Sequence, residues 1–408
     1  MSEDNGGYEA PTRRDYMKYG GAVVGGTLLA GCAGQSDSDG TPESTRNQTA
    51  TSAATESETA TGGNGETETA EKSTEDKSYS VTMVPVGELM FERPPEKAVA
   101  YWSTYGDMLV ALGQGDALQA TAWGPGSYPK YPYEEIPNLD FSPEQTGSLY
   151  ADGGLSKELL YEMNPDIIHF DPNIMRQWFG FDDSDIKEVT EDLGPFAANY
   201  IRRKGDKWHD YPYYSLYEAF EKIAKIYQQE ERYEAFKKLH DDTINSIRSR
   251  LPQKADRPSV ALIMSGSDMK KGEIVGVPVE DQVGKKQYYD LGVENGLAEL
   301  ETDESLYNFD YEGLLEADPE NIVIPWGMTE SEESFKKKFV QPMKDDPVGS
   351  QVAAVKNDRV FRGGAPNQGP IINLVNTEIA AHQLYPGIFG DEQLFDRQRV
   401  ADIVNGEM

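Results

Sequence analysis

Aromatic and cationic side chains follow several segments that the sequence predicts as buried strands. Short apolar, β-rich runs such as KAVAYW at 97–102 and DIIHF at 166–170 indicate these strands. In open α/β sheets the carboxyl ends of the strands form the binding crevice. The candidates for a cleft are therefore Tyr101, Trp102, Tyr105, Trp123, Tyr128, His169, Asp171, Arg176, Trp178, Met264, Ser265, Lys270, Trp326 and Met328. The segment NYIRRKGDKWHDYPYY at 199–214, between the third strand and the linking helical pattern, adds Arg202 and Arg203 as residues that line the opening. Aromatic walls suit a bulky, partly apolar ligand, and arginine or lysine pairs with anionic oxygens.

Catalytic signatures are absent from the sequence. It contains no G-x-S-x-G, P-loop or H-E-x-x-H motif, and Cys32 is its only cysteine. His169 and Asp171 are two residues apart, on one face of an extended strand, but such a pair is more often structural than a ligand set. We expect no enzyme, no protein metal site and no cofactor, while a haem axial ligand from a tyrosine or histidine stays open.

The charge of the chain excludes a nucleic-acid partner. The 408 residues include 71 acidic and 38 basic side chains, so the formal net charge is −33, whereas phosphate backbones favour basic proteins. Such a surface promotes solubility and suits very high salt, where repulsion is screened. The length predicts two or three domains, and the 38% of hydrophobic residues can form a large core.

The first 78 residues read as an export signal and a tether. Arg13 and Arg14 precede a short, glycine-rich apolar run in a pattern that resembles the twin-arginine export signal. The segment 29–32 resembles a lipobox, so cleavage after residue 31 leaves Cys32 as the lipid-modified first residue; an ordinary cysteine beside a weak transmembrane helix is the alternative. Residues 35–78 contain no Leu, Ile, Val, Met, Phe, Tyr or Trp, which predicts a disordered tether over 32–78.

The remaining residues predict an α/β fold with two lobes. Strand and helix patterns alternate over 79–214 and again over 253–408, which indicates mainly parallel sheets flanked by helices. A helical pattern over 215–252 joins the lobes and ends at Pro252. It reads as one long helix or as two helices broken near residues 229–231.

One unit of sequence occurs twice. SKELLYEMNPDIIHF at 156–170 and DYEGLLEADPENIVI at 310–324 each place a Glu before a helical pattern, a Pro seven residues later, and then a strand. The two acids, Glu158 and Glu312, are 154 residues apart. In a first helical turn a Glu complements the helix dipole, which is a sufficient structural reason for its presence.

Together these stretches resemble the substrate-binding lipoproteins of ABC importers for iron-siderophores, haem and cobalamin. The resemblance covers about residues 80–390 and includes AVKNDRVFR at 354–362 and INLVNTEIAAHQLYP at 372–386. It implies a monomeric protein anchored by lipid at the extracytoplasmic face of the membrane, which delivers a ferric siderophore-type chelate to a permease and its ATPase subunit. It also implies that Glu158 and Glu312 dock onto the permease. Cobalamin or haem binding, or a surface lipoprotein without transport, are the alternatives.

Overall fold

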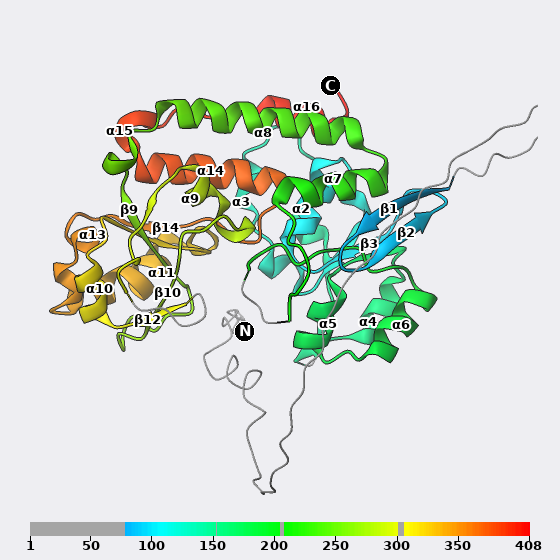
Figure 1. Ribbon diagram of the computed structural model, residues 1–408, viewed down its shortest axis with the longest axis horizontal. Coiled ribbons are helices and arrows are strands. Elements are labelled where there is room, and N and C mark those ends of the chain that lie inside the picture. Colours follow the sequence, from blue (N-terminus) through cyan, green and yellow to red (C-terminus); the bar gives the residue numbers. More distant parts are fainter. Residues whose placement is uncertain (1–77, 152, 205–207, 301–305) are drawn as a thin grey trace, which may run out of the picture.

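The computed structural model describes residues 78–151, 153–204, 208–300 and 306–408. The predicted export signal with Arg13 and Arg14, the lipid-carrying Cys32 and nearly all of the tether lie outside these residues. Figure 1 shows two α/β lobes side by side, with α8 (Glu230–Arg250) and α14 (Pro370–Leu384) running along one side across both of them.

The N-terminal lobe is built on a four-stranded, entirely parallel sheet. Its strand order is β5 (Gly147–Ser148), β4 (Leu118–Thr121), β3 (Ala98–Ala100), β8 (Ile167–His169). An antiparallel hairpin of β1 (Tyr79–Met83) and β2 (Gly87–Phe91) lies beside it. The helices of this lobe are α2 (Ser103–Ala111), α3 (Tyr131–Glu134), α4 (Lys157–Met163), α5 (Pro172–Phe179) and α6 (Asp183–Asp192).

The C-terminal lobe has a mixed sheet. Its order is β12 (Tyr307–Phe309), β10 (Ile274–Val277), β9 (Ser259–Ile263), β13 (Asn321–Ile324), β14 (Val360–Arg362), and β11 (Glu294–Asn295) also pairs with β9. β10 runs antiparallel to β9 and to β12, and the other pairings are parallel. The helices are α9 (Lys286–Asp290), α10 (Tyr311–Ala317), α11 (Glu332–Phe335), α12 (Gln341–Asp345), α13 (Ala353–Lys356) and α15 (Pro386–Phe389). The last helix, α16 (Arg397–Asn405), returns to the N-terminal lobe, where it packs against α2 and α8.

The helical segment between the lobes consists of two helices. α7 (Leu216–Tyr227) ends at Gln228, whose φ of 52° is left-handed, and α8 begins two residues later. The buried face of α7, including Phe220 and Ile223, packs in the core of the N-terminal lobe. α8 leaves that core and crosses to the other lobe (Figure 1). The break is needed because α7 packs within the N-terminal lobe whereas α8 runs across to the other lobe, and one straight helix could not do both.

The repeated sequence folds into the same unit in both lobes. Each copy is a seven-residue helix, α4 or α10, whose N-cap side chain accepts a hydrogen bond from a backbone N–H three residues later. Each helix ends on a left-handed residue, Asn164 or Asp318. A proline and a buried strand follow, and the offset of 154 residues holds from N-cap to strand. The glutamates in the two first turns are both exposed.

A buried carboxylate joins the N-terminal lobe to α14. Asp107 on α2 is fully buried. Its Oδ2 accepts hydrogen bonds from the backbone N–H groups of Ile371 (2.9 Å) and Ile372 (3.2 Å), and its Oδ1 accepts one from the Tyr133 hydroxyl. A Cβ atom at Gly369 would lie 2.5 Å from Oδ2, so only glycine allows this approach. Asp107 therefore caps the first turn of the helix that spans both lobes.

We expect Asp107→Ala to lower the free energy of unfolding by about 3 kcal/mol, because it leaves two N–H groups and a hydroxyl buried without their acceptor. Chemical denaturation of the purified chain in high salt measures the change. Asp116→Ala, at an exposed position of the same lobe, is the control and should stay within about 0.5 kcal/mol of the wild type. Equal stabilities of the two variants would contradict the proposed cap.

Candidate ligand-binding cleft

The strands of the N-terminal sheet end level with one another. Ala100 of β3 is in register with Thr121 of β4 and His169 of β8, and Thr121 is in register with Ser148 of β5. Each is the last residue of its strand. Residues one and two positions further on therefore form two rows across the carboxyl edge of the sheet, where ligands bind in open α/β folds.

The first row packs inward. It consists of Tyr101, Ala122, Leu149 and Phe170, all buried in one apolar cluster. The rings of Tyr101 and Phe170 meet edge to face with centroids 5.5 Å apart. This row holds the edge of the sheet to the helices beneath it.

The second row consists of Tyr150, Trp123, Trp102 and Asp171, in strand order β5, β4, β3, β8. The ring centroids of Trp102 and Trp123 are 4.7 Å apart, and those of Trp123 and Tyr150 are 6.2 Å apart. These separations follow the spacing of adjacent strands, which is about 4.8 Å. The guanidinium of Arg202 lies over the Trp102 ring, 4.5 Å from the ring centroid.

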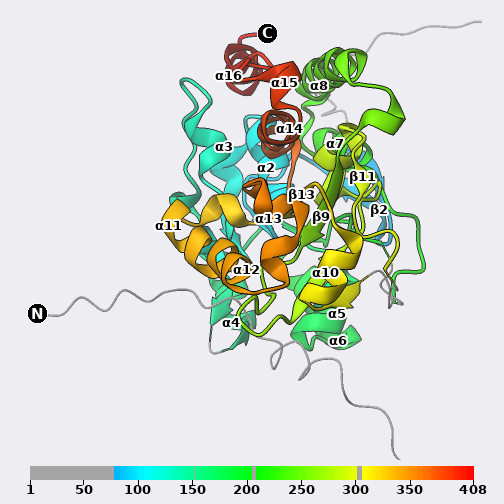
Figure 2. The ribbon, with the colours of Figure 1, turned by 90° about the vertical axis from the view of Figure 1, so that its left-hand side faces the viewer.

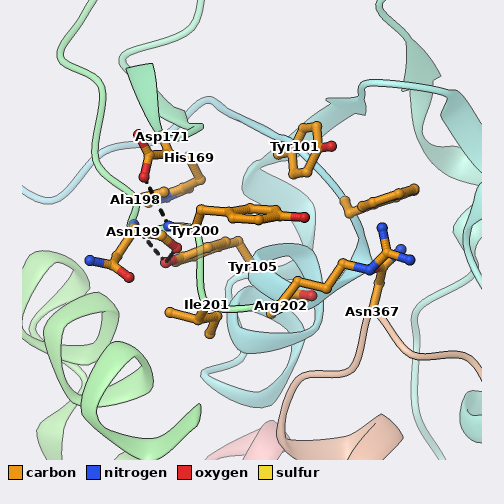
Figure 3. Close-up of a pocket in the computed structure, with 12 residues that line it drawn as sticks. Tyr101, Tyr105, His169, Asp171, Ala198, Asn199, Tyr200, Ile201, Arg202 and Asn367 are labelled. Carbon is orange, nitrogen blue, oxygen red and sulfur yellow. Dashed lines mark hydrogen bonds between the residues drawn. The ribbon is translucent and has the colours of Figure 1, made fainter. Parts of the chain in front are cut away.

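A pocket opens beside this row. It is lined by Tyr101, Trp102, Thr104, Tyr105, His169, Asp171, Ala198, Asn199, Tyr200, Ile201, Arg202 and Asn367. Its free volume of about 20 Å³ has room for about one water molecule. Figure 3 shows the side chain of Arg202 extending toward Asn367, which lies between β14 and α14. The N-terminal lobe and the segment between β14 and α14 thus both contribute residues to the pocket.

The buried acid and the histidine at the pocket serve the fold. His169 contacts the Ala197 carbonyl through Nδ1 (3.0 Å) and the Tyr227 hydroxyl through Nε2 (3.0 Å), and burial lowers its pKa to about 4. Its Nδ1–H therefore donates and its Nε2 accepts. Asp171 caps α5 and accepts hydrogen bonds from the backbone of Tyr200 and the Tyr211 hydroxyl, and burial raises its pKa. Both nitrogens of His169 are occupied, so it is not placed to bind haem iron.

Cations from the two lobes converge near the pocket. Arg203 lies over Trp178, 5.8 Å from the ring centroid. The backbone carbonyl of Arg202 accepts a hydrogen bond from Gly284, and Lys285 follows in the C-terminal lobe. The pKa of Lys285 is lowered to about 8, mainly by burial and in addition by repulsion from Arg203 and Arg202, although Glu280 lies 3.7 Å from it. Three basic side chains therefore share one region.

Several predicted cleft residues lie apart from the pocket. Tyr128 is buried in the N-terminal core against Tyr133 and Phe141, and Arg176 pairs with Asp183 beyond α5. Trp178 contacts Tyr101 and Tyr200 at its margin. The five candidates of the C-terminal lobe are not among the lining residues, and they are Met264, Ser265, Lys270, Trp326 and Met328.

Sequence reasoning missed Asn367 and Lys285. Asn367 lies five residues after β14. The expectation that cleft residues follow the ends of strands could therefore have included it. Lys285 lies in a short 3₁₀ turn, Val283–Lys285, that no strand or helix pattern indicates. Its position depends on the contact between Gly284 and Arg202, which joins residues 82 positions apart.

The two repeated glutamates lie on one side of the molecule. α4 and α10 lie on the side opposite α8 and α14, one in each lobe, in both views (Figures 1 and 2). Glu158 and Glu312 are exposed there.

Among the described residues, no three His, Cys, Asp or Glu side chains are grouped so that they could hold a metal ion. The described helices include none with the length and hydropathy of a membrane span.

Comparisons with known proteins agree with this architecture. A model of the periplasmic binding protein family matches residues 98–366, about two thirds of the chain. A search of curated proteins found no match. Among solved structures, a periplasmic binding protein from Veillonella parvula has a TM-score of 0.56 at 16% identity, covering 76% of this chain and 97% of that one.

Two further structures have the same fold. The iron-uptake ABC transporter substrate-binding protein PiuA from Streptococcus pneumoniae has a TM-score of 0.53 at 13% identity, covering 75% of this chain and 98% of its own. Staphylococcus aureus SirA, complexed with staphyloferrin B, has a TM-score of 0.52 at 12% identity, with the same coverage of both chains. The family match and the shared two-lobed fold define a binding protein. The chain belongs to the periplasmic binding protein family.

Proposed function

We propose that this chain is the substrate-binding protein of an ABC importer and that it captures an anionic ferric chelate of the siderophore type between its lobes. The observation that carries the proposal is the convergence of Arg202, Arg203 and Lys285. The whole chain has a net charge of −33. A local group of positive side chains in such a negatively charged chain creates a region of positive potential, which favours an anionic ligand.

The kind of solute follows from the cations and rings together. Guanidinium and ammonium groups form short, charge-assisted hydrogen bonds with anionic oxygens. The rings around Tyr101 offer a large apolar surface beside them. A compact chelate with anionic oxygens on an organic frame meets both requirements. The solved structures of an iron-uptake protein and of a complex with staphyloferrin B support this class of ligand.

We expect Lys285→Met to weaken binding of an anionic ferric chelate about tenfold, because a charge-assisted contact is lost. Isothermal titration of the full chain with ferric citrate and with a ferric tris-catecholate measures it. Lys356→Met, an exposed position on α13, is the control and should bind like the wild type. If the wild type binds none of these chelates below about 10 μM, the proposed function is wrong.

The same titration has an expected pH dependence. The Lys285 pKa of about 8 lies below its ordinary value, so its positive charge is lost as the pH rises through 8. Wild-type affinity for an anionic chelate should therefore fall between pH 7 and 9. Lys285→Met should show no such fall over that range. A parallel decline in both proteins would assign the effect to another group.

We further propose that Glu158 and Glu312 contact the permease. They occupy equivalent positions in two copies of one unit and are exposed, and the helices that carry them, α4 and α10, lie on the side opposite α8 and α14 (Figures 1 and 2). One charge on each lobe allows a partner to contact both lobes at once. Rim charges of this kind steer and orient a partner more than they add affinity.

Reversing both charges, Glu158→Lys with Glu312→Lys, should abolish chelate uptake by the native cells while the purified chain binds its ligand as before. The chain offers a matched control, Glu162→Lys with Glu316→Lys. These acids lie one turn further along the same helices, are also exposed and are also 154 residues apart. Uptake that survives the first pair, or is lost equally with the second, contradicts specific docking.

The N-terminal segment supplies the proposed anchor. Residues 1–31 would direct export through Arg13 and Arg14, and 32–78 would tether the lobes of 79–214 and 253–408, with their link at 215–252, to a lipid on Cys32. Two acyl chains hold a protein at a membrane where one holds it weakly. Cys32→Ser should move the chain from the membrane fraction to the soluble fraction of native cells. An unchanged distribution would show that lipid on Cys32 is not the anchor.

A further inference from the structure

The row formed by Trp102, Trp123 and Tyr150 ends in different surroundings on its two sides. At the inner end, Arg202 covers Trp102 beside the pocket. At the outer end, 39% of Tyr150 is exposed, one of the few large apolar or aromatic side chains of the described structure with such exposure. The three rings are neighbours from the pocket to the surface, with Trp102 tilted by 34° against Trp123 and Trp123 stacked on Tyr150.

Two buried polar groups at the inner end are unsatisfied. Within the described part of the chain, the indole N–H of Trp102 and the side-chain amide of Asn367 have no hydrogen-bond partner. Asn367 is fully buried, and its backbone carbonyl accepts a hydrogen bond from the Ser103 hydroxyl, which holds it against the other lobe. A buried polar group without a partner costs about 1–3 kcal/mol. Atoms of a ligand or of water would give both groups the hydrogen-bond partners that they lack.

These features distinguish between the classes of iron chelate. Three hydroxamate arms neutralise a ferric ion, so the neighbouring cations add little to the binding of such a chelate. Hydroxycarboxylate chelates are anionic but aliphatic, so stacked rings add little. Catecholate arms combine anionic oxygens with a planar aromatic ring. They alone among these three use the cations, the unsatisfied donors and the stack of rings together.

We infer that the cleft selects chelates whose iron-binding arms are aryl oxyanions of the catecholate type, with the aromatic row extending onto the ligand's rings. This inference rests on the proposed function and names the ligand class within it. The aryl ring lies against the row outside the pocket. One of its oxygens enters the pocket, whose free volume of about 20 Å³ has room for one such atom, and meets the guanidinium of Arg202, the Trp102 N–H and the Asn367 amide. In the structure without ligand, the Trp102 N–H and the Asn367 amide lack hydrogen-bond partners, and the Tyr150 ring is exposed.

Calorimetric titration of the full chain compares a ferric tris-catecholate, a ferric trihydroxamate of the desferrioxamine type and ferric citrate. We expect the catecholate to bind at least tenfold more tightly than the other two. Tyr150→Leu and Trp123→Leu should each weaken catecholate binding about threefold to tenfold and hydroxamate binding by a smaller factor, because leucine keeps an apolar surface but not a ring. Trp123→Phe should recover most of the loss, because it restores a ring.

The matched control is Tyr289→Leu. Among the described residues, Tyr289 on α9 is the other exposed tyrosine, at 46%, and it lies outside the aromatic row. Its variant should keep the wild-type preference. Equal or tighter binding of the hydroxamate or of citrate by the wild type would overturn the inference and leave the proposed function standing. Binding of none of the three would overturn the proposed function itself.

Discussion

The level ending of four parallel strands is the constraint on which the binding region depends. Because Ala100, Thr121, Ser148 and His169 end their strands in register, the chain leaves the sheet at the same height four times. Side chains alternate along each strand, so the next residues pack inward and those after them form an outward row. Two tryptophans and a tyrosine, far apart in sequence, become a stack through this register alone. A shift of one residue in any pair would exchange core and cleft.

The second requirement is a firm joint between the lobes. Asp107 fastens α2 to the start of α14, and α14 in turn packs on α9 of the other lobe. Burial raises the pKa of Asp107 to about 7, and the hydrogen bonds that it accepts from Tyr133, Ile372 and Ile371 oppose this rise. With α8 crossing in parallel (Figure 1), the lobes are held by helices and not by flexible strands. Such a joint favours small movements on ligand capture.

The charges of the molecule are divided between two uses. Most acidic side chains of the described residues are on the surface, where they favour solubility, and the two repeated glutamates belong to that surface. Arg202, Arg203 and Lys285 are drawn instead toward the contact between the lobes. An anionic ligand that pairs with these cations would contact both lobes. The electrostatic design thus links recognition of the ligand to the relative position of the lobes.

Much of the architecture is readable from local patterns, because strands, caps and turns depend on nearby residues. The two α/β lobes, the repeated helix–strand unit and the alternative of a broken linking helix all rest on periodicity and on residues such as Pro165 and Pro319. The antiparallel pairing of β10 with β9 and β12 was not predicted, since a hairpin and a crossover leave similar short runs in the sequence.

The site was only partly predictable for a related reason. The position of residues after strand ends predicted Tyr101, Trp102, Tyr105, His169 and Asp171, and the segment before the linking helix added Arg202. All six line the pocket. Position after a strand end could not separate Tyr128, which lies in the core, from true neighbours of the pocket. By itself, the sequence determined the kinds of element, their order and the acidic character of the chain. Only the tertiary structure decided that Asn367 and Lys285 lie near Arg202, because contacts between distant segments depend on how the lobes pack and not on any local pattern.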